Sequence, residues 1–125
     1  MSDCLFCKIA EGAVPATRVL ESERTIAFRD INPQAPTHVL VIPRAHYPDL
    51  ADLAAAGDGL LAEVAEVAHQ VAVAEGIADS GYRVVFNTGS HAGQTVDHAH
   101  AHLLGVRRMA WPPGYGGVIE EASRG

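Results

Sequence analysis

The sequence lacks any uninterrupted apolar run near the roughly 20 residues that a membrane-spanning helix needs, and its first residues lack the basic-then-apolar order of a secretory signal. Basic residues are also scarce. Nine Lys plus Arg face fifteen Asp plus Glu, and the formal net charge of -6 opposes binding to a nucleic-acid backbone. We therefore expect a cytoplasmic protein with no membrane or nucleic-acid partner. A small phosphate ligand stays open, because a few local donors can bind it whatever the net charge.

Cysteine is nearly absent: Cys4 and Cys7 are the only two. In a reducing cytosol, a Cys-x-x-Cys pair is more often a metal-ligand pair or a redox couple than a structural disulfide. The redox interpretation is weaker because no thioredoxin-like strand precedes Cys4. A tetrahedral zinc site would need two further ligands from elsewhere in the chain. The alternative is two buried cysteines that pack a short N-terminal helix.

No repeat, linker or low-complexity stretch divides the 125 residues, of which 48% are hydrophobic, so one domain is expected. Hydrophobic periodicity and turn residues predict a helix over 3–11, strands over 18–21, 25–29 and 37–42, a long helix from Asp58 to about Gly76, and strands over 82–87 and 96–104. Five short strands with one long helix between the third and fourth favour an antiparallel α+β domain over a doubly wound parallel sheet.

The last expected strand carries three histidines at alternate positions, His98, His100 and His102, which would share one face. Residues i and i+4 of a strand lie about 13 Å apart, which disfavours one metal bound by all three. A row of imidazoles suits an extended substrate with His100 at its centre, and a neutral imidazole is a nucleophile for which phosphorus is a natural electrophile. The preceding Gly93-Gln94-Thr95 would offer N–H groups and a hydroxyl to phosphoryl oxygens, although it is also compatible with an ordinary glycine turn.

The segment from His98 to Leu104 resembles the His-x-His-x-His motif of the histidine triad (HIT) superfamily. Blocks that resemble its Hint branch, bacterial type, follow the same order along the chain: Asp30 to Pro43, Asn87-Thr88-Gly89, Ala92 to Val96, and Trp111-Pro112-Pro113-Gly114. The resemblance implies a HIT-like α+β fold with a five-stranded antiparallel sheet, one long helix and a short N-terminal helix. It also implies a single HIT domain over 1–125, with a core of about 3–114 and an extension over 115–125, that forms a homodimer.

The same resemblance implies a nucleotide-binding hydrolase that cleaves purine nucleoside 5'-phosphoramidates of the AMP-amine type through a nucleotidyl-histidine intermediate, with no metal required for catalysis. The catalytic residues that it implies are His100, His102, His38 and Thr95. The nucleotide-binding residues are Asp30, Ile31, Asn87, Gly93, Gln94, Thr95, His100 and His102. Asp30 also has a physical argument of its own, because a carboxylate can accept both hydrogen bonds of a ribose cis-diol.

For the cysteines, the resemblance to bacterial HIT proteins implies a structural zinc held by Cys4, Cys7, His46 and His98. Ala110 departs from the family pattern, because animal-like Hint proteins carry His before the Trp-Pro-Pro-Gly segment. The resemblance therefore implies the reaction more firmly than it implies which leaving group this chain prefers.

Three alternatives remain. One is a dinucleoside polyphosphate hydrolase or nucleotidyl transferase of another HIT branch, against which the Trp-Pro-Pro-Gly segment argues. Another is a non-catalytic nucleotide-binding interaction protein. The last is a zinc-only structural module, which gives no role to residues such as His100 and Thr95.

Overall fold

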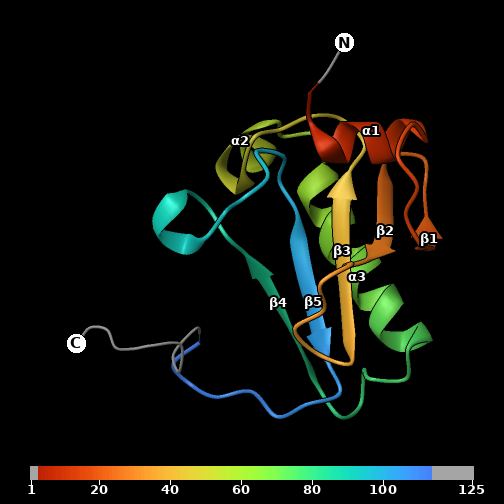
Figure 1. Cartoon of the computed structure of the whole chain (residues 1–125), viewed down its shortest axis with the longest axis vertical. Helices are drawn as coiled ribbons and strands as arrows, with labels where there is room; N and C mark the ends of the chain where they lie inside the picture. The colour runs from red at the N-terminus through yellow and green to blue at the C-terminus, as the bar shows by residue number, and fades with distance from the viewer. Residues whose placement is uncertain (1–2, 114–125) are drawn as a thin grey trace.

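The computed structural model describes residues 3–113, and its elements follow the predicted α+β order (Figure 1). They are α1 (Leu5–Glu11), β1 (Arg18–Glu21), β2 (Thr25–Arg29), β3 (Thr37–Pro43), α2 (Leu50–Ala55), α3 (Leu60–Ala74), β4 (Tyr82–Phe86), the short 3-10 turn η1 (Ser90–Ala92) and β5 (Ala101–Gly105). The extension predicted over 115–125 lies outside the described residues.

The five strands form one antiparallel sheet in the order β1-β2-β3-β5-β4. Strand β5 pairs with both β3 and β4, which therefore run in the same direction and need a crossover connection. That connection contains α2 and α3, and α3 runs along one face of the sheet (Figure 1). The predicted fold class is confirmed.

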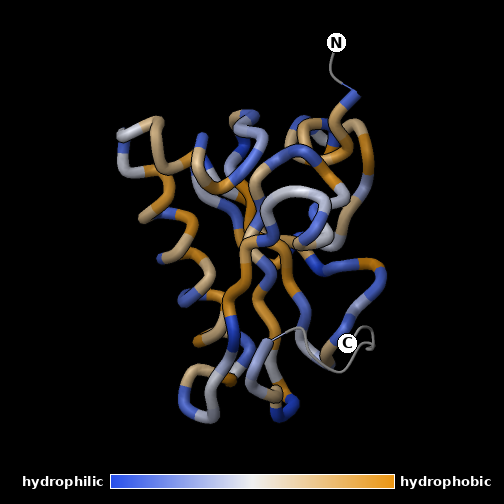
Figure 2. Tube along the Cα trace, turned by 90° about the vertical axis from the view of Figure 1, so that its left-hand side faces the viewer, coloured by the Kyte–Doolittle hydropathy of each residue, from blue (hydrophilic) through white to orange (hydrophobic). Residues whose placement is uncertain are grey.

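Strands β2 and β3 are buried on both faces, and Figure 2 shows hydrophobic residues concentrated in the strands of the sheet. On one face the cluster of buried residues combines α1 with the sheet: Phe6, Ile9, Ile26, Phe28, Leu40 and Ile42. On the other face, alternate strand residues pack with the helices; they include Ala27, Val39, Val41, Ala101 and Leu103, together with Leu53 of α2 and the apolar stripe of α3. This two-sided burial explains the continuous apolar run of β3.

The long helix α3 buries the stripe that its sequence predicted, including Leu60, Val64, Val67 and Val71. Its length is 15 residues, and no helix within residues 3–113 is long and apolar enough to cross a membrane.

At the other end of the chain, α1 ends at Gly12, whose φ of 83° places it in the left-handed region that favours glycine. The two helices thus lie on opposite faces, and the face with α1 is the one that carries the predicted site.

The strand predicted over 96–104 is wrong in its first half, because β5 begins at Ala101. The Nε2–H of His98 donates to the carbonyl oxygen of Pro43 at 2.8 Å, and the Ala99 amide donates to the carbonyl oxygen of Tyr47 at 2.7 Å. These bonds hold the chain against the last residue of β3 and the segment that follows it, outside the sheet ladder. Only His102 of the three histidines therefore lies in a strand.

The sequence did not predict α2, which has six residues and is too short to display a helical period. Its signals are local. Asp49 caps the first turn by accepting a hydrogen bond from the Asp52 amide at 3.0 Å, and Leu53 is the buried residue that anchors the helix.

The two faces of α3 give a matched test of the core. Val71 is 2% exposed and Val73 is 58% exposed on the same helix. We expect Val71→Ala to lower the free energy of unfolding by about 1–3 kcal/mol, because it removes two buried methyl groups and leaves a cavity. Val73→Ala should change it by less than about 0.5 kcal/mol. Urea titration of both variants measures this, and equal losses would contradict the assigned core face.

Candidate functional site

His100 lies just before β5 and is only 6% exposed. Its Nδ1 lies 2.7 Å from the carbonyl oxygen of His98. A carbonyl only accepts, so Nδ1 carries the proton, and a neutral ring then leaves a lone pair on Nε2. Burial is the main influence that lowers the pKa of His100, which favours this neutral form. The edge-to-face ring of Phe6, 4.9 Å away between centroids, packs against the imidazole. The His100 ring is thus held neutral, with its Nε2 lone pair unprotonated.

His38 and His102 are linked in a chain of hydrogen bonds. This chain gives His102 the tautomer opposite to that of His100. The Gln34 amide donates to Nδ1 of His38 at 3.0 Å, so the proton of the neutral His38 ring lies on Nε2. That Nε2–H faces Nδ1 of His102 at 2.9 Å. His102 accepts there, and the proton of its own ring lies on Nε2. The rings of His100 and His102 lie 4.9 Å apart between centroids, so one presents a lone pair and the other an N–H.

The histidine cluster stays neutral because its members are buried together. The pKa of His102 is lowered to about 4, chiefly by burial and then by the positive charges that His100 and His38 would carry when protonated. The negative charge of Asp30 acts in the opposite direction and raises this pKa. Burial also lowers the pKa of His38, where Asp30 again opposes it and the positive charge of Arg107 adds to it. At neutral pH the cluster can therefore supply a nucleophile and a hydrogen-bond donor together.

Two pockets meet at His102. The first, which we call the apolar pocket, has a volume of about 250 Å³ and contains the predicted residues Asp30, Ile31, Thr95 and His100 beside apolar side chains that include Phe6, Ile9, Phe28 and Leu40. The second, which we call the arginine pocket, has a volume of about 690 Å³ and contains His38, Asn87, His91, Arg83 and Arg107. His102 is the one residue that lines both. The structure thus places the predicted catalytic histidines between two differently lined spaces.

The loop before the histidines is held by its own hydrogen bonds. The amides of Gly93 and Gln94 donate to Ser90 and Gly89 carbonyls at 3.1 Å each. The Gln94 side chain donates to the carbonyl oxygen of Pro48 at 2.7 Å and accepts from the Gly89 amide at 3.0 Å. Gly93 has a φ of 82°, which requires glycine. Direct phosphate contacts by Gly93 and Gln94 stay a prediction; in the structure Gln94 fastens the loop.

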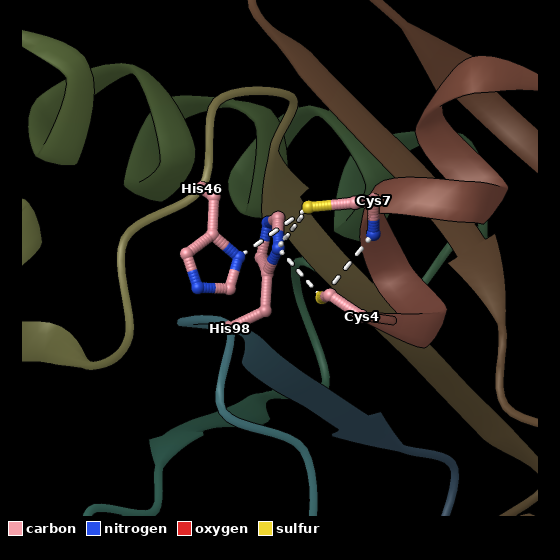
Figure 3. A group of neighbouring side chains, drawn as sticks. All are labelled: Cys4, Cys7, His46 and His98. Carbon is pink, nitrogen blue, oxygen red and sulfur yellow. Dashed lines mark hydrogen bonds between the residues drawn. The ribbon is translucent and has the colours of Figure 1, made fainter. Parts of the chain in front are cut away.

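Cys4, Cys7, His46 and His98 form a cluster whose ligand atoms all lie within 4.8 Å of one another (Figure 3). The sulfur-to-Nδ1 distances are 3.4 Å for Cys4–His98, 3.3 Å for Cys7–His46 and 3.6 Å for Cys7–His98. Tetrahedral zinc with ordinary Zn–S and Zn–N bonds separates S and N by about 3.5 Å. The Nε2–H of His98 donates to Pro43, so its Nδ1 lone pair faces the sulfur atoms. The four residues fit zinc in number, chemistry and spacing.

The cysteine–histidine cluster and the predicted catalytic histidines are joined through two residues. The carbonyl of His98 holds His100, and Phe6, between the two cysteines in sequence, contacts the rings of His98 and His100 at 6.0 and 4.9 Å between centroids. Sequence reasoning missed Phe6, which reads as an ordinary core residue of α1. It also missed Arg83 and Arg107, whose spacing carries no motif, and the Gln34 amide, which only a tertiary contact identifies.

Comparison with known proteins gives consistent results. Residues 11–109 match the family model described as the HIT domain. The chain is 44% identical over 107 residues to the purine nucleoside phosphoramidase of Escherichia coli (strain K12), covering 86% of this chain and 90% of that protein. It is 49% identical over 116 residues to the 14 kDa zinc-binding protein of Zea mays, covering 90% and 89%. The solved structure of a HIT family hydrolase from Legionella pneumophila Philadelphia 1 has a TM-score of 0.86 and 53% identity, covering 90% of this chain and 100% of that chain.

The lowered pKa of His102 predicts an acid-dependent loss of stability. Its pKa is about 4 in the folded protein and near 6.5 when unperturbed, so between these values the unfolded chain binds more protons and stability falls as pH falls. From pH 7 to pH 4.5, we expect the free energy of unfolding of the wild type to fall by about 2 kcal/mol more than that of His102→Gln. Urea titrations at both pH values measure the difference, and equal losses in the two proteins would contradict the burial of a neutral His102.

Proposed function

The chain belongs to the HIT domain family, and on that premise we propose that it hydrolyses the P–N bond of purine nucleoside 5'-phosphoramidates. The observation that carries this proposal is the opposite protonation of two adjacent rings. His100 presents a lone pair on Nε2, and His102 presents an N–H, at the junction of two pockets. A nucleophile beside a donor is what displacement at phosphorus requires. The name of the Escherichia coli relative supports the substrate class.

In the first step, Nε2 of His100 attacks the phosphorus, and the P–N bond breaks with its electron pair staying on nitrogen. The adduct carries a positive charge on the His100 ring. The hydrogen bond from Nδ1–H of His100 to the carbonyl oxygen of His98 stabilises this charge. The departing nitrogen needs a proton to leave as an amine. Solvent supplies that proton, because a neutral His102 that gave up its only ring proton would become an imidazolate. Nε2–H of His102 instead donates a hydrogen bond to the reacting group, since His102 borders both pockets.

In the second step, water attacks the phosphorus of the nucleotidyl-histidine, and the bond from phosphorus to Nε2 breaks. The electron pair returns to Nε2 of His100, the attacking water releases one proton to solvent, and the nucleoside monophosphate leaves. The apolar pocket is suited to the base, because Phe6, Phe28 and Leu40 line it. Asp30 at the same pocket supplies carboxylate oxygens for the ribose hydroxyls. Thr95 places a hydroxyl beside His100 there.

We further propose that Cys4, Cys7, His46 and His98 hold a structural zinc ion, in keeping with the name of the Zea mays relative. The ion would fasten α1, the segment after β3 and the segment before β5 to one another. It would supply no chemistry to the reaction. The single-domain organisation, the homodimer and the cytoplasmic location stay predictions from the sequence.

The first test uses a fluorogenic adenosine phosphoramidate, with diadenosine tetraphosphate as the competing substrate. We expect the wild type to cleave the phosphoramidate and His100→Ala to lose about three orders of magnitude or more in kcat. Binding of AMP by His100→Ala, measured by calorimetry, controls for folding. Near wild-type turnover by the variant would remove the covalent mechanism. Cleavage of the dinucleotide alone would assign another HIT branch, and no cleavage of either would favour a binding protein.

The zinc site is tested with two exposed histidines, one inside the cluster and one outside it. We expect His46→Gln to lower both the bound zinc per chain and the melting temperature, the latter by at least about 4 °C, because a ligand is lost. His69→Gln should retain zinc, since His69 instead faces the hydroxyl of Tyr82 at 2.8 Å. Cys4→Ser provides a second ligand variant. Unchanged zinc content in both ligand variants, by elemental analysis, would refute the site.

A further inference from the structure

The arginine pocket and the apolar pocket share His102 as a lining residue, and the proposed function leaves the occupant of the arginine pocket open. If the nucleoside enters the apolar pocket and His100 attacks phosphorus there, the bond that breaks points away from His100, because attack and departure are in line. His102 is the residue that both pockets share. The arginine pocket is lined by His102 and not by His100, so we assign the departing group to it.

Within residues 3–113, some arginines form ion pairs and others do not. Arg18, Arg24, Arg29 and Arg44 each form an ion pair with a glutamate or aspartate. Within residues 3–113, Arg83 and Arg107 form none. Arg83 donates to the carbonyl oxygen of Ala110 at 3.2 Å, and Arg107 donates through Nε to the carbonyl oxygen of Gln34 at 2.9 Å. Their contacts hold the side chains in place and leave their charges without a counter-charge.

The lining of the arginine pocket contains no aspartate or glutamate among the described residues. Asp30, the carboxylate of the site, lines the apolar pocket, and its Oδ2 lies 3.4 Å from Nε2 of His38, which lines the arginine pocket. His91 and Asn87 add further hydrogen-bonding groups. In a chain with a formal net charge of -6, two uncompensated guanidinium groups make a local region of positive potential. Guanidinium is the side chain best matched to the paired oxygens of a carboxylate or a phosphate.

We propose that the arginine pocket binds an anionic leaving group, so that this enzyme prefers nucleoside phosphoramidates whose amine carries an oxyanion such as a carboxylate. The proposal rests on the proposed function and deepens it. An amino acid joined to phosphorus through its amine nitrogen has this chemistry, and a leaving group that carries phosphate shares it. Arg83 and Arg107 would then be residues that determine specificity, and the bond-breaking chemistry would stay with His100 and His102.

The test compares two adenosine 5'-phosphoramidates that differ in one group: the amine is glycine in one and glycinamide in the other. We expect the wild type to favour the glycine substrate in kcat/KM by about tenfold, chiefly through KM, because the charge is bound in the ground state as well as in the transition state. In Arg83→Gln, and in Arg107→Gln, this preference should fall at least about fivefold. Raising the salt concentration should weaken it in the wild type, since exposed charges are screened.

Arg108→Gln is the matched control, because Arg108 forms no ion pair within residues 3–113 and lines neither pocket. It removes the same charge at the neighbouring position and should leave the glycine preference unchanged. The two amines differ in intrinsic reactivity, but that difference is the same for every variant. The ratio of preferences between wild type and variant therefore isolates the pocket. Arg107→Lys keeps the charge and should retain more of the preference than Arg107→Gln.

The outcomes separate the two proposals. Equal preferences in the wild type, Arg83→Gln and Arg107→Gln would overturn the anionic pocket, while cleavage of the glycinamide substrate would still support the proposed function. A third substrate, diadenosine tetraphosphate, distinguishes the source of the anion. If Arg83→Gln impairs its cleavage and leaves the glycine preference intact, the pocket binds phosphate and the carboxylate assignment is wrong. Cleavage of no phosphoramidate by the wild type would overturn both proposals together.

Discussion

The hydrogen bond from Nε2–H of His98 to the carbonyl oxygen of Pro43 is the contact on which the site depends. It directs the other ring nitrogen of His98 toward Cys4 and Cys7. It also holds the chain before β5 away from the sheet ladder, in the position where the His98 carbonyl can accept from His100. One side chain therefore orients the proposed zinc ligands on one side and the proposed nucleophile on the other, as second-sphere hydrogen bonds do in metal sites.

Burial is the second constraint, and it explains why so many histidines are compatible with a stable domain. A charged imidazole taken from water into this interior is costly, whereas a neutral one needs only one donor and one acceptor partner. The hydrogen bonds from Gln34 to His38 and from His38 to His102 supply those partners. The lowered pKa values and the fixed tautomers of these histidines both result from burial beside a small set of hydrogen-bond partners. A site built in this way has its protons in place before substrate arrives, which is the preorganisation that electrostatic catalysis requires.

The two pockets differ in the chemistry of their lining residues, which suits each of them to a different part of the proposed substrate. The apolar pocket is built from both α1 and the strands β2 and β3, since Phe6, Phe28 and Leu40 meet there. The arginine pocket is built from β4, the turn after β5 and the loop before β3. Its charge is a property of this chain's own residues.

Local patterns in the sequence determined much of the fold. Three features could be predicted from the sequence: the turn between β1 and β2, the apolar run of β3 and the apolar stripe of α3. Turn residues and the spacing of apolar side chains depend on neighbours only a few positions away, so the sequence alone shows them. The spacing of the histidines also excluded a metal bound by all three. The assignment of His46 and His98 to the cysteines came from family resemblance, since spacing alone left the ligands open.

Tertiary structure alone decided where β5 begins, which ring nitrogens carry protons and which arginines lack a counter-charge. Each of these depends on partners distant in sequence, such as Pro43 for His98, Gln34 and His102 for His38, and Glu75 for Arg29. Hydrogen bonds and ion pairs are selected by short distances in space, whereas periodicity reports only the neighbours along the chain. The sequence therefore indicated the histidines of the proposed site, and the fold assigned each one its proton.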